Sequence, residues 1–243
     1  MRPLILAHRG ANQTAPQNTL PAFEEAIRRG ADGVEFDVRM TSDGRLVVCH
    51  NPTVDTTSNG TGRIEAMPLA ELRSLDFGSW FDPAFRGTRI PLLEEVLDLV
   101  RDLEMINIEL KRPRTPLRQD VVEKTILTAE AFHLEDRVIY SSFDLPTLAA
   151  VKSFRPKART GILYSFHTAK EQGMQRGGAF RQARTLRADA LHPSLNYVIN
   201  PMYLARCRTA GLEINTWGVR SEQEMRIAKK LPLHSIITDY IDV

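Results

Sequence analysis

Short apolar runs alternate with helix-forming segments along almost the whole chain, and this alternation restricts the fold more than any other feature. Eight such runs are expected to form strands in parallel βα order, which at this chain length favours a (β/α)8 TIM barrel. An open doubly wound sheet is the rival fold, but no glycine-rich nucleotide fingerprint follows the first strand. The expected strands are Pro3–Ala7, Val34–Thr41, Ile106–Leu110, Arg137–Ser142, Thr160–Tyr164, Ala188–His192, Glu213–Val219 and Ser235–Thr238.

Helical periodicity fills the gaps between these strands. The first helix is expected to follow an N-cap at Asn18 or Thr19, with Pro21 near its first position, and to end before Gly30. Further helices are expected near 91–103, 116–131, 144–154, 199–210 and 221–230, with a less regular helical connection from about 168 to 187. An eighth helix is expected to be missing after the last strand, which leaves that side of the barrel open to a second copy in a homo-oligomer.

A β-hairpin is expected between residues 34 and 50, because Asp43-Gly44 between two apolar runs is a strong turn signal. Its return arm, Leu46–Cys49, adds an antiparallel strand that distorts the barrel. From about 51 to 89 the strand and helix pattern is lost, which predicts a small insertion with its own core. The aromatic residues expected in that core are Phe77, Trp80, Phe81 and Phe85. Residues 1–243 are expected to form one domain around the barrel.

The same hairpin predicts a metal site. If Asp43 and Gly44 are the two central turn residues, Asp37 lies directly opposite His50. Side chains alternate along a strand, so Glu35 shares the face of Asp37 and His50. Two carboxylates inside an apolar strand pair need a cation beside them, because an unpaired buried charge is costly.

The overall composition excludes several functional classes. A formal net charge of +2 gives no electrostatic reason to expect nucleic acid or an acidic membrane as the main partner. Two cysteines are too few for a disulfide framework or a cysteine-rich zinc site. The first residues are too short in apolar content for a signal peptide, and no run reaches the ~18 residues of a membrane span. A cytoplasmic protein without stable membrane insertion is therefore expected.

Polar residues collect where the expected strands end. Any one of them alone would most often be structural, but their joint placement indicates a site, because the carboxyl ends of barrel strands form the active site. The residues are His8 and Arg9 after the first strand, Glu35 and Asp37 in the second, Glu109 and Lys111 in the third, Trp217 in the seventh and Asp239 after the eighth.

The residue types indicate phosphoester cleavage. Glu35, Asp37 and Glu109 offer hard oxygen ligands, which suit Mg²⁺ or Ca²⁺ better than zinc. Arg9 and Lys111 supply fixed positive charge for a phosphate group. Two histidines can act as acid and base near neutral pH, typically worth about 10²–10⁴-fold in rate. A cation, phosphate-binding side chains and two imidazoles are together typical of phosphodiester hydrolysis.

Several ordered motifs carry a family resemblance. They are Ala7-His8-Arg9-Gly10-Ala11, Ala15-Pro16-Gln17-Asn18-Thr19, the run from Gly30 to Val38, Leu46-Val47-Val48-Cys49-His50, Asn107-Ile108-Glu109-Leu110-Lys111 and Ile236-Ile237-Thr238-Asp239. On these motifs the chain resembles the glycerophosphodiester phosphodiesterase family over essentially its whole length. The resemblance implies a distorted barrel with an insertion after the second catalytic histidine, and hydrolysis of small glycerophosphodiesters to sn-glycerol 3-phosphate and an alcohol. Glycerophosphocholine and glycerophosphoethanolamine are the substrates implied, usually with a divalent cation.

The resemblance also implies a function for each matched residue. It implies that His8 and His50 are the catalytic acid–base pair, that Glu35, Asp37 and Glu109 hold the metal, that Arg9 and Lys111 contact the phosphate, and that Trp217 lies against the glycerol or the leaving group. Two residues depart from the family pattern: Gln17 stands where the family usually has Glu, and Asn51 where it usually has Asp. Both changes keep hydrogen-bonding capacity and lose a negative charge, which is expected to alter the pKa of the histidines or the substrate preference.

Alternatives remain at three points. The nucleophile is either water or the 2-hydroxyl of glycerol, which would give a cyclic phosphate first, and either histidine can be the acid. Lysophospholipase D activity would require an apolar channel, for which the four aromatics of the insertion are the only candidates. A catalytically silent protein that binds glycerophosphodiesters is a third reading, against which the intact histidine pair argues.

Overall fold

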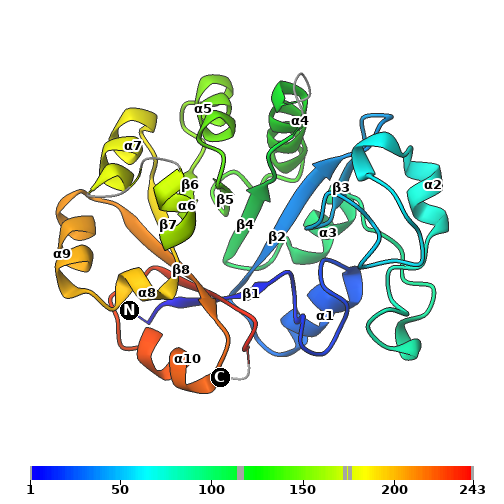
Figure 1. The fold of residues 1–243 in the computed structure, drawn as a ribbon, viewed down its shortest axis with the longest axis horizontal. Coiled ribbons are helices and arrows are strands. Elements are labelled where there is room, and N and C mark those ends of the chain that lie inside the picture. Colours follow the sequence, from blue (N-terminus) through cyan, green and yellow to red (C-terminus); the bar gives the residue numbers. More distant parts are fainter. Residues whose placement is uncertain (1, 114–117, 172–173, 175–176, 242–243) are drawn as a thin grey trace.

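Eight parallel strands close into a barrel, and a ninth, antiparallel strand extends it at β2 (Figure 1). The computed structural model describes residues 2–113, 118–171, 174 and 177–241. Each strand of the barrel pairs with its neighbours, and β1–β2 pairing closes the ring, so the predicted TIM barrel with an extra hairpin strand is confirmed. The strands are β1 Leu4–His8, β2 Gly33–Met40, β3 Leu46–Val48, β4 Met105–Leu110, β5 Val138–Ser142, β6 Thr160–Tyr164, β7 Ala190–Pro193, β8 Glu213–Val219 and β9 Ser235–Thr238.

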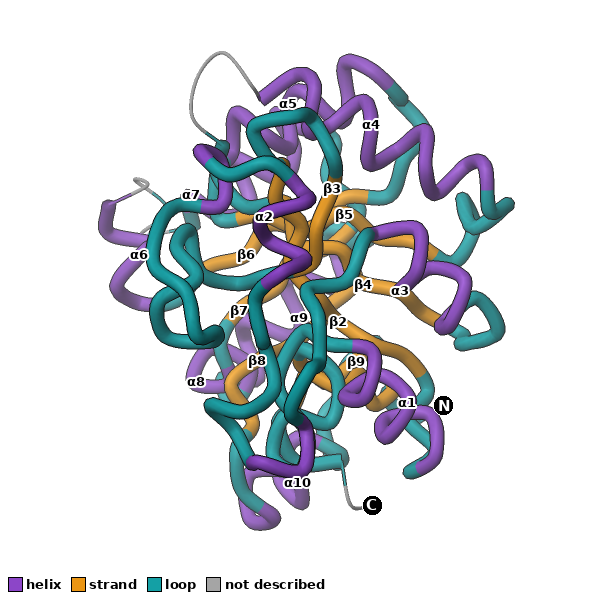
Figure 2. The backbone as a smooth tube through the Cα atoms, turned by 90° about the vertical axis from the view of Figure 1, so that its right-hand side faces the viewer, coloured by secondary structure: helices purple, strands orange, loops and turns teal. Residues whose placement is uncertain are grey.

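Helices between the strands cover the outside of the barrel (Figures 1 and 2). They lie close to the predicted segments, although residues 116–117 of one prediction fall outside the described residues, as do 172–173 and 175–176 of the connection from 168 to 187. The described residues of that connection include most of α6 and all of α7. The helices are α1 Leu20–Arg28, α2 Leu69–Ser74, α3 Leu93–Val100, α4 Arg118–Ala131, α5 Leu145–Phe154, α6 Phe166–Glu171, α7 Gly178–Leu186, α8 Leu195–Val198, α9 Pro201–Thr209 and α10 Glu222–Ala228.

Two layers of apolar side chains surround and fill the barrel. Outward-facing strand residues pack against the helices in the largest buried cluster, which includes Phe23, Phe36 and Ile108. Inside the barrel a smaller cluster fills the amino-terminal half, and it contains Leu6, Met105, Ile139, Ala190 and Ile237. Because side chains alternate along a strand, the inward-facing residues two positions later lie above this apolar layer, toward the carboxyl ends of the strands. The interior is therefore apolar below and polar above.

The register of the hairpin differs by one residue from the prediction. The Gly44 N–H donates to the Thr41 carbonyl at 3.1 Å, Gly44 has a φ of 76°, and Thr41 bonds across the turn to Arg45. The loop is thus a three-residue turn that ends on a left-handed glycine, not a two-residue turn. Met40 pairs with Leu46, so the Cys49 N–H donates to the Asp37 carbonyl and His50 is not opposite Asp37.

The insertion has its own apolar core, but a different one from that predicted. It consists of Val54, Ile64, Met67, Leu72 and Phe77, packed against Val47, Cys49 and Ile90. Three of the four aromatics expected there stay outside: Trp80 is 41% exposed and contacts Phe81, which contacts Phe85 edge to face. Aliphatic residues and Phe77 fill the space under the loops, and the other three aromatics lie outside this core.

No helix of the described residues is long and apolar enough to cross a membrane. The expected missing eighth helix involves residues 242–243, which lie outside the described part of the chain. The expected cytoplasmic location and homo-oligomer remain predictions.

A histidine lies inside the barrel away from the polar end of β1, β2 and β4. His192 in β7 is fully buried, and its Nε2 accepts a hydrogen bond from Asn215 Nδ2 at 3.0 Å. A Cβ atom at Gly161 would lie 2.1 Å from that nitrogen, so the neighbouring strand needs a glycine there. Burial lowers the pKa of His192 to about 3, so the side chain is neutral in the folded protein.

Acid is therefore expected to weaken the fold through His192. In the unfolded chain His192 binds a proton below its ordinary pKa of 6.5, whereas in the folded chain it stays neutral down to about pH 3. The free energy of unfolding therefore falls as the pH is lowered across that window. The expected loss is at most about 1.4 kcal/mol per pH unit. Urea unfolding between pH 7 and 4 should show a shallower decline for His192→Asn than for wild type. His167→Gln, at an exposed site, is the control; equal slopes for wild type and His192→Asn would contradict the prediction.

Candidate active site

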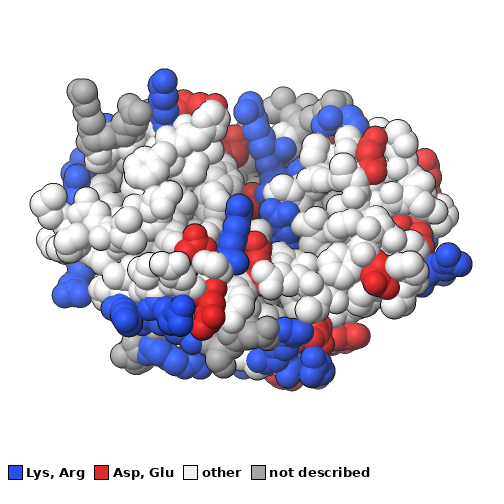
Figure 3. Space-filling model, turned by 60° about the horizontal axis from the view of Figure 1, so that its bottom comes forward, with Lys and Arg blue, Asp and Glu red and all other residues white. Residues whose placement is uncertain are grey.

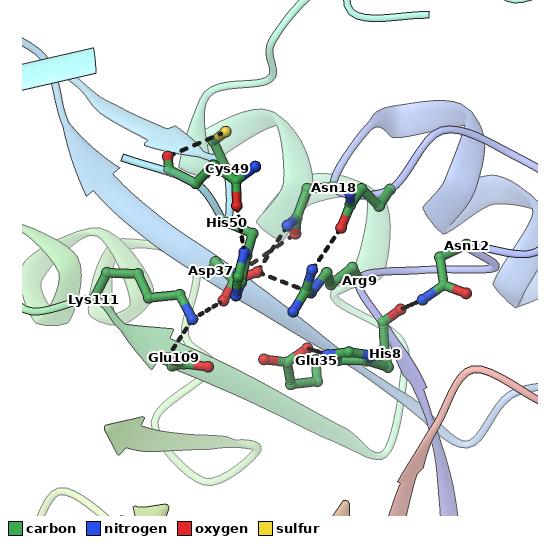
Figure 4. A network of polar contacts seen from close by, with 12 residues as sticks. His8, Arg9, Asn12, Asn18, Glu35, Asp37, Cys49, His50, Glu109 and Lys111 are labelled. Carbon is green, nitrogen blue, oxygen red and sulfur yellow. Dashed lines mark hydrogen bonds and ion pairs between the residues drawn. The ribbon is translucent and has the colours of Figure 1, made fainter. Parts of the chain in front are cut away.

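Three neighbouring strands bring the predicted acidic and basic residues together at their carboxyl ends (Figure 4). The parallel register aligns His8 of β1 with Glu35 of β2, and Asp37 of β2 with Glu109 of β4. Since all four face the barrel interior, neighbouring strands stack their side chains into one cluster. His50 comes from the segment that follows β3, so its position is set by that bend and not by strand alternation.

The three carboxylates form a compact buried group. Glu35, Asp37 and Glu109 each offer an oxygen within 4.8 Å of the others, and they are only 3%, 0% and 7% exposed. Burial and the nearby charge of Asp37 raise the pKa of Glu35, and burial also raises the pKa of Glu109. Glu35 Oε2 is buried without a hydrogen-bond partner among the described residues. Hard oxygen ligands, excess negative charge and an unpartnered oxygen fit a divalent cation.

Two cations flank the acids. Lys111 Nζ lies 2.8 Å from Asp37 Oδ1 and also bonds Glu109, and Arg9 Nε lies 3.5 Å from Asp37 Oδ2. Although burial opposes its charge, these cations hold the pKa of Asp37 well below its usual range. Arg9 in turn donates to Gln17 Oε1 at 2.6 Å. Gln17 therefore keeps the contact to Arg9 without adding a fourth negative charge to the group.

Asn18 holds the most buried carboxylate in place. Its Nδ2 donates to Asp37 Oδ2 at 2.8 Å, and its backbone has a φ of 58°, which Asn tolerates better than most residues. The prediction that Asn18 or Thr19 caps α1 is right only in position. Thr19 occupies the N-cap without a side-chain cap bond, and its hydroxyl donates to the Pro16 carbonyl.

Each histidine is oriented through its Nδ1. His8 Nδ1 lies 2.5 Å from Asp239 Oδ1, which also accepts from Asn12, and His8 Nε2 lies 3.9 Å from Glu35 Oε2. Burial opposes the positive charge of His8, but the hydrogen bond to Asp239 and the charge of Glu35 outweigh it and raise its pKa. The sequence predicted Asp239 at the site but not its hydrogen bond to His8, and it gave no signal for Asn12.

His50 lies in a different electrostatic environment. Its Nδ1 is 2.8 Å from Asn51 Oδ1, and Asn51 Nδ2 donates to Thr56 Oγ1 at 2.6 Å. The neutral amide of Asn51 thus orients the ring but adds no charge to it. Burial lowers the pKa of His50 to about 4, and the positive charges of Lys111 and Arg9 add to the effect of burial.

A cavity of about 230 Å³ is lined by both histidines, the two glutamates and the two cations of the site, namely His8, His50, Glu35, Glu109, Arg9 and Lys111. Trp217 forms part of its wall, held by a hydrogen bond from Nε1 to the His192 carbonyl and by an edge-to-face contact with Phe143. A wider groove of about 1110 Å³ adjoins the cavity through Glu109, Lys111 and Phe143. Basic and acidic side chains also meet in a hollow near the centre of the face in Figure 3. The cavity suits a small polar ligand with a longer group that extends into the groove.

Known proteins of one family are similar to this chain. The sequence model described as the Glycerophosphoryl diester phosphodiesterase family matches residues 8–243. A protein of Caldanaerobacter subterraneus subsp. tengcongensis named glycerophosphodiester phosphodiesterase is 37% identical over 240 residues, covering 98% of this chain and 95% of the relative.

Solved structures show the same likeness. The crystal structure of a glycerophosphodiester phosphodiesterase from Agrobacterium tumefaciens has a TM-score of 0.84 and 29% identity, covering 99% of this chain and 97% of that chain. A phosphodiesterase of Oleispira antarctica, solved in complex with the product sn-glycerol-3-phosphate, has a TM-score of 0.88 and 26% identity. That match covers 99% of this chain and 94% of the other.

The acid group is expected to bind Ca²⁺ or Mg²⁺ and to stabilise the fold by doing so. At a cation concentration about 100 times the Kd, binding should add about 2.7 kcal/mol and raise the Tm by about 5–10 °C. Glu109→Gln should lose most of this shift, because it removes one ligand charge. Glu222→Gln, an exposed acid on α10, is the matched control. A wild-type Tm insensitive to both cations, or an equal shift in Glu109→Gln, would contradict the assignment.

Proposed function

The chain belongs to the glycerophosphoryl diester phosphodiesterase family and is an enzyme of that class, and we propose that it hydrolyses small glycerophosphodiesters by cation-assisted acid–base catalysis. Glycerophosphocholine and glycerophosphoethanolamine are the proposed substrates, with sn-glycerol 3-phosphate and an alcohol as products. The observation that carries the proposal is the group of three buried carboxylates at a cavity that two of them, Glu35 and Glu109, line together with both histidines. The product named in the Oleispira antarctica structure supports the choice of substrate class.

Five side chains would bind the phosphate and its cation. Glu35, Asp37 and Glu109 would hold Mg²⁺ or Ca²⁺, which supplies positive charge to the non-bridging phosphate oxygens when bound. Arg9 and Lys111 already lie beside this group, and they would contact the phosphate and stabilise the charge that grows on it in the transition state. Their contacts with Asp37 hold them in place before substrate arrives, which limits the reorganisation needed for reaction.

The two histidines would move the protons. One imidazole accepts the proton of the nucleophile, water or the 2-hydroxyl of glycerol, and the other donates a proton to the departing oxygen. Asp239 occupies His8 Nδ1 and Asn51 occupies His50 Nδ1, so the Nε2 atom of each ring is left for this transfer. Phosphodiester hydrolysis needs both steps, because neither nucleophile nor leaving alkoxide is stable in its charged form at neutral pH.

The cavity and the groove would bind different parts of the substrate. We place the glycerol phosphate in the 230 Å³ cavity against Trp217, and the leaving alcohol in the groove. The groove is open and carries both signs of charge, with Arg39, Arg63 and Arg112 near Glu65 and Asp144. Such a surface suits polar headgroups of different kinds.

Lysophospholipase D activity receives no support from the insertion. Phe77 is buried in the insertion core, and Trp80, Phe81 and Phe85 contact one another. Within the described residues, none of the four lines the cavity or the groove.

Removal of either imidazole should abolish most of the activity. His8→Ala and His50→Ala are each expected to lower kcat/KM for glycerophosphocholine by about 10²–10⁴-fold. The assay is release of sn-glycerol 3-phosphate with Mg²⁺, with Ca²⁺ and with EDTA, which should stop the wild-type enzyme. His167→Ala, at an exposed position on α6, is expected to match wild type. Either variant within threefold of wild type, while equally folded, would refute the acid–base pair.

The shape of the site also predicts substrate preference. The wild-type enzyme should hydrolyse glycerophosphocholine at least about tenfold faster than lysophosphatidylcholine. Among the described residues, none of the four aromatics of the insertion lines the cavity or the groove, and a hydrophobic group such as an acyl chain gains only where it is buried. Both substrates release choline on hydrolysis of the same type of bond by this class of enzyme, so a single choline assay compares them. Faster hydrolysis of the lysophospholipid would reverse the proposed substrate class.

A further inference from the structure

One buried amide at the cavity has no hydrogen-bond partner among the described residues. Asn107 in β4 is fully buried and borders the 230 Å³ cavity. In the part of the chain that the structure describes, neither its Nδ2 nor its Oδ1 has a hydrogen-bond partner. A buried polar group without a partner is costly, and in native proteins it usually indicates a bound molecule or a function.

The register places Asn107 beside Glu35 and one level below Glu109. It aligns with Glu35 of β2 on one side and with Ile139 of β5 on the other. It precedes Glu109 by two residues, so its side chain faces the same interior space one level deeper. Leu163 and Ile237 border the same cavity, which makes Asn107 a polar residue beside apolar walls.

A second asparagine inside the barrel has protein hydrogen-bond partners at both ends of its amide, as expected for a structural residue. Asn215 in β8 is also fully buried, but its Nδ2 bonds His192 at 3.0 Å and its Oδ1 accepts from Ser235 Oγ at 2.8 Å. The barrel can therefore satisfy an asparagine at both ends with its own side chains. At Asn107 it does not, which favours a ligand as the missing partner.

The amide has one chemical complement among the groups of the substrate. Its Nδ2 donates and its Oδ1 accepts, and a hydroxyl group does both. A phosphate oxygen would use only the donor, and a cation only the acceptor, so each would leave one end unpaired. A hydroxyl of the glycerol moiety carries the matching pair.

We propose that Asn107 binds a hydroxyl of the glycerol moiety and thereby selects glycerol diesters over diesters that lack this hydroxyl. The inference rests on the proposed function, since it assumes that glycerol phosphate occupies the cavity. Asn107 is a specificity residue in this account and takes no part in proton transfer. Sites built to hydrogen-bond a hydroxyl discriminate strongly against its absence, because their own polar groups are then left unpaired.

The test compares three substrates on wild type and on Asn107→Leu. The substrates are glycerophosphocholine and the phosphocholine diesters of 1,2-propanediol, with the phosphate on C1, and of 1,3-propanediol, which lack the counterparts of the sn-1 hydroxyl and the sn-2 hydroxyl respectively. Wild type should prefer glycerophosphocholine over one of these analogues by about 10–100-fold in kcat/KM, and the variant should reduce that preference to within about threefold. Choline release measures all three reactions. Asn107→Ala provides a second variant should the larger side chain disturb the barrel.

Stability separates a ligand-binding amide from a structural one. Asn107→Leu should unfold at the same or higher urea concentration than wild type, because it removes an unpaired polar group. Asn215→Leu, the matched control, should unfold at a lower concentration because it breaks two hydrogen bonds.

If the wild-type enzyme is active, three results would overturn the inference about Asn107 and leave the proposed function standing. They are full wild-type selectivity in both Asn107 variants, an equal loss on all three substrates with weaker cation binding, and a destabilisation as large as that of Asn215→Leu. A wild-type enzyme that releases no sn-glycerol 3-phosphate from any glycerophosphodiester with either cation would instead overturn the proposed function, and this inference with it.

Discussion

The mutual repulsion of three carboxylates in a buried space is the constraint around which this site is arranged. Glu35, Asp37 and Glu109 lie within 4.8 Å of one another and are almost closed to solvent. Like charges at such distances oppose ionisation, and Lys111 and Arg9 compensate mainly at Asp37. Burial, and after it the charge of Asp37, raises the pKa of Glu35, so the cations of the protein do not fully compensate this carboxylate. A divalent cation would complete the compensation, so the electrostatics that make the site unfavourable when empty are those that favour binding and catalysis.

The barrel makes this concentration of charge tolerable because it separates packing from chemistry along each strand. In β4, Met105 belongs to the apolar interior cluster while Glu109, four residues later on the same face, belongs to the acid group. Residues that stabilise the fold and residues that bind ligand thus occupy different levels of one structure. Asn107 lies at the level between them, where a polar group meets apolar walls.

Much of this arrangement was predictable, because strand ends in a parallel barrel meet at one rim and their acidic and basic residues are visible in the sequence. The hairpin register was not, because Asp43-Gly44 fits two-residue and three-residue loops, and the choice depends on how Thr41 bonds Arg45. The sequence predicted Asn18 only as a candidate helix cap. Its hydrogen bond to Asp37 was not predictable, because that partner lies 19 residues away. The aromatic residues of the insertion predicted its core, but only Phe77 lies there, among aliphatic residues, because the core depends on packing in space. The unpartnered state of Asn107 depends on its surroundings in space, which strand periodicity does not describe.

Anomalous diffraction from crystals grown with Ca²⁺ tests the central claim most directly. The account predicts one strong peak among the oxygens of Glu35, Asp37 and Glu109, with ligand distances of about 2.3–2.6 Å, and with the Nε2 atoms of His8 and His50 facing the space beside it. Crystals that diffract well at saturating Ca²⁺, yet show no peak within the acid group, would contradict the account.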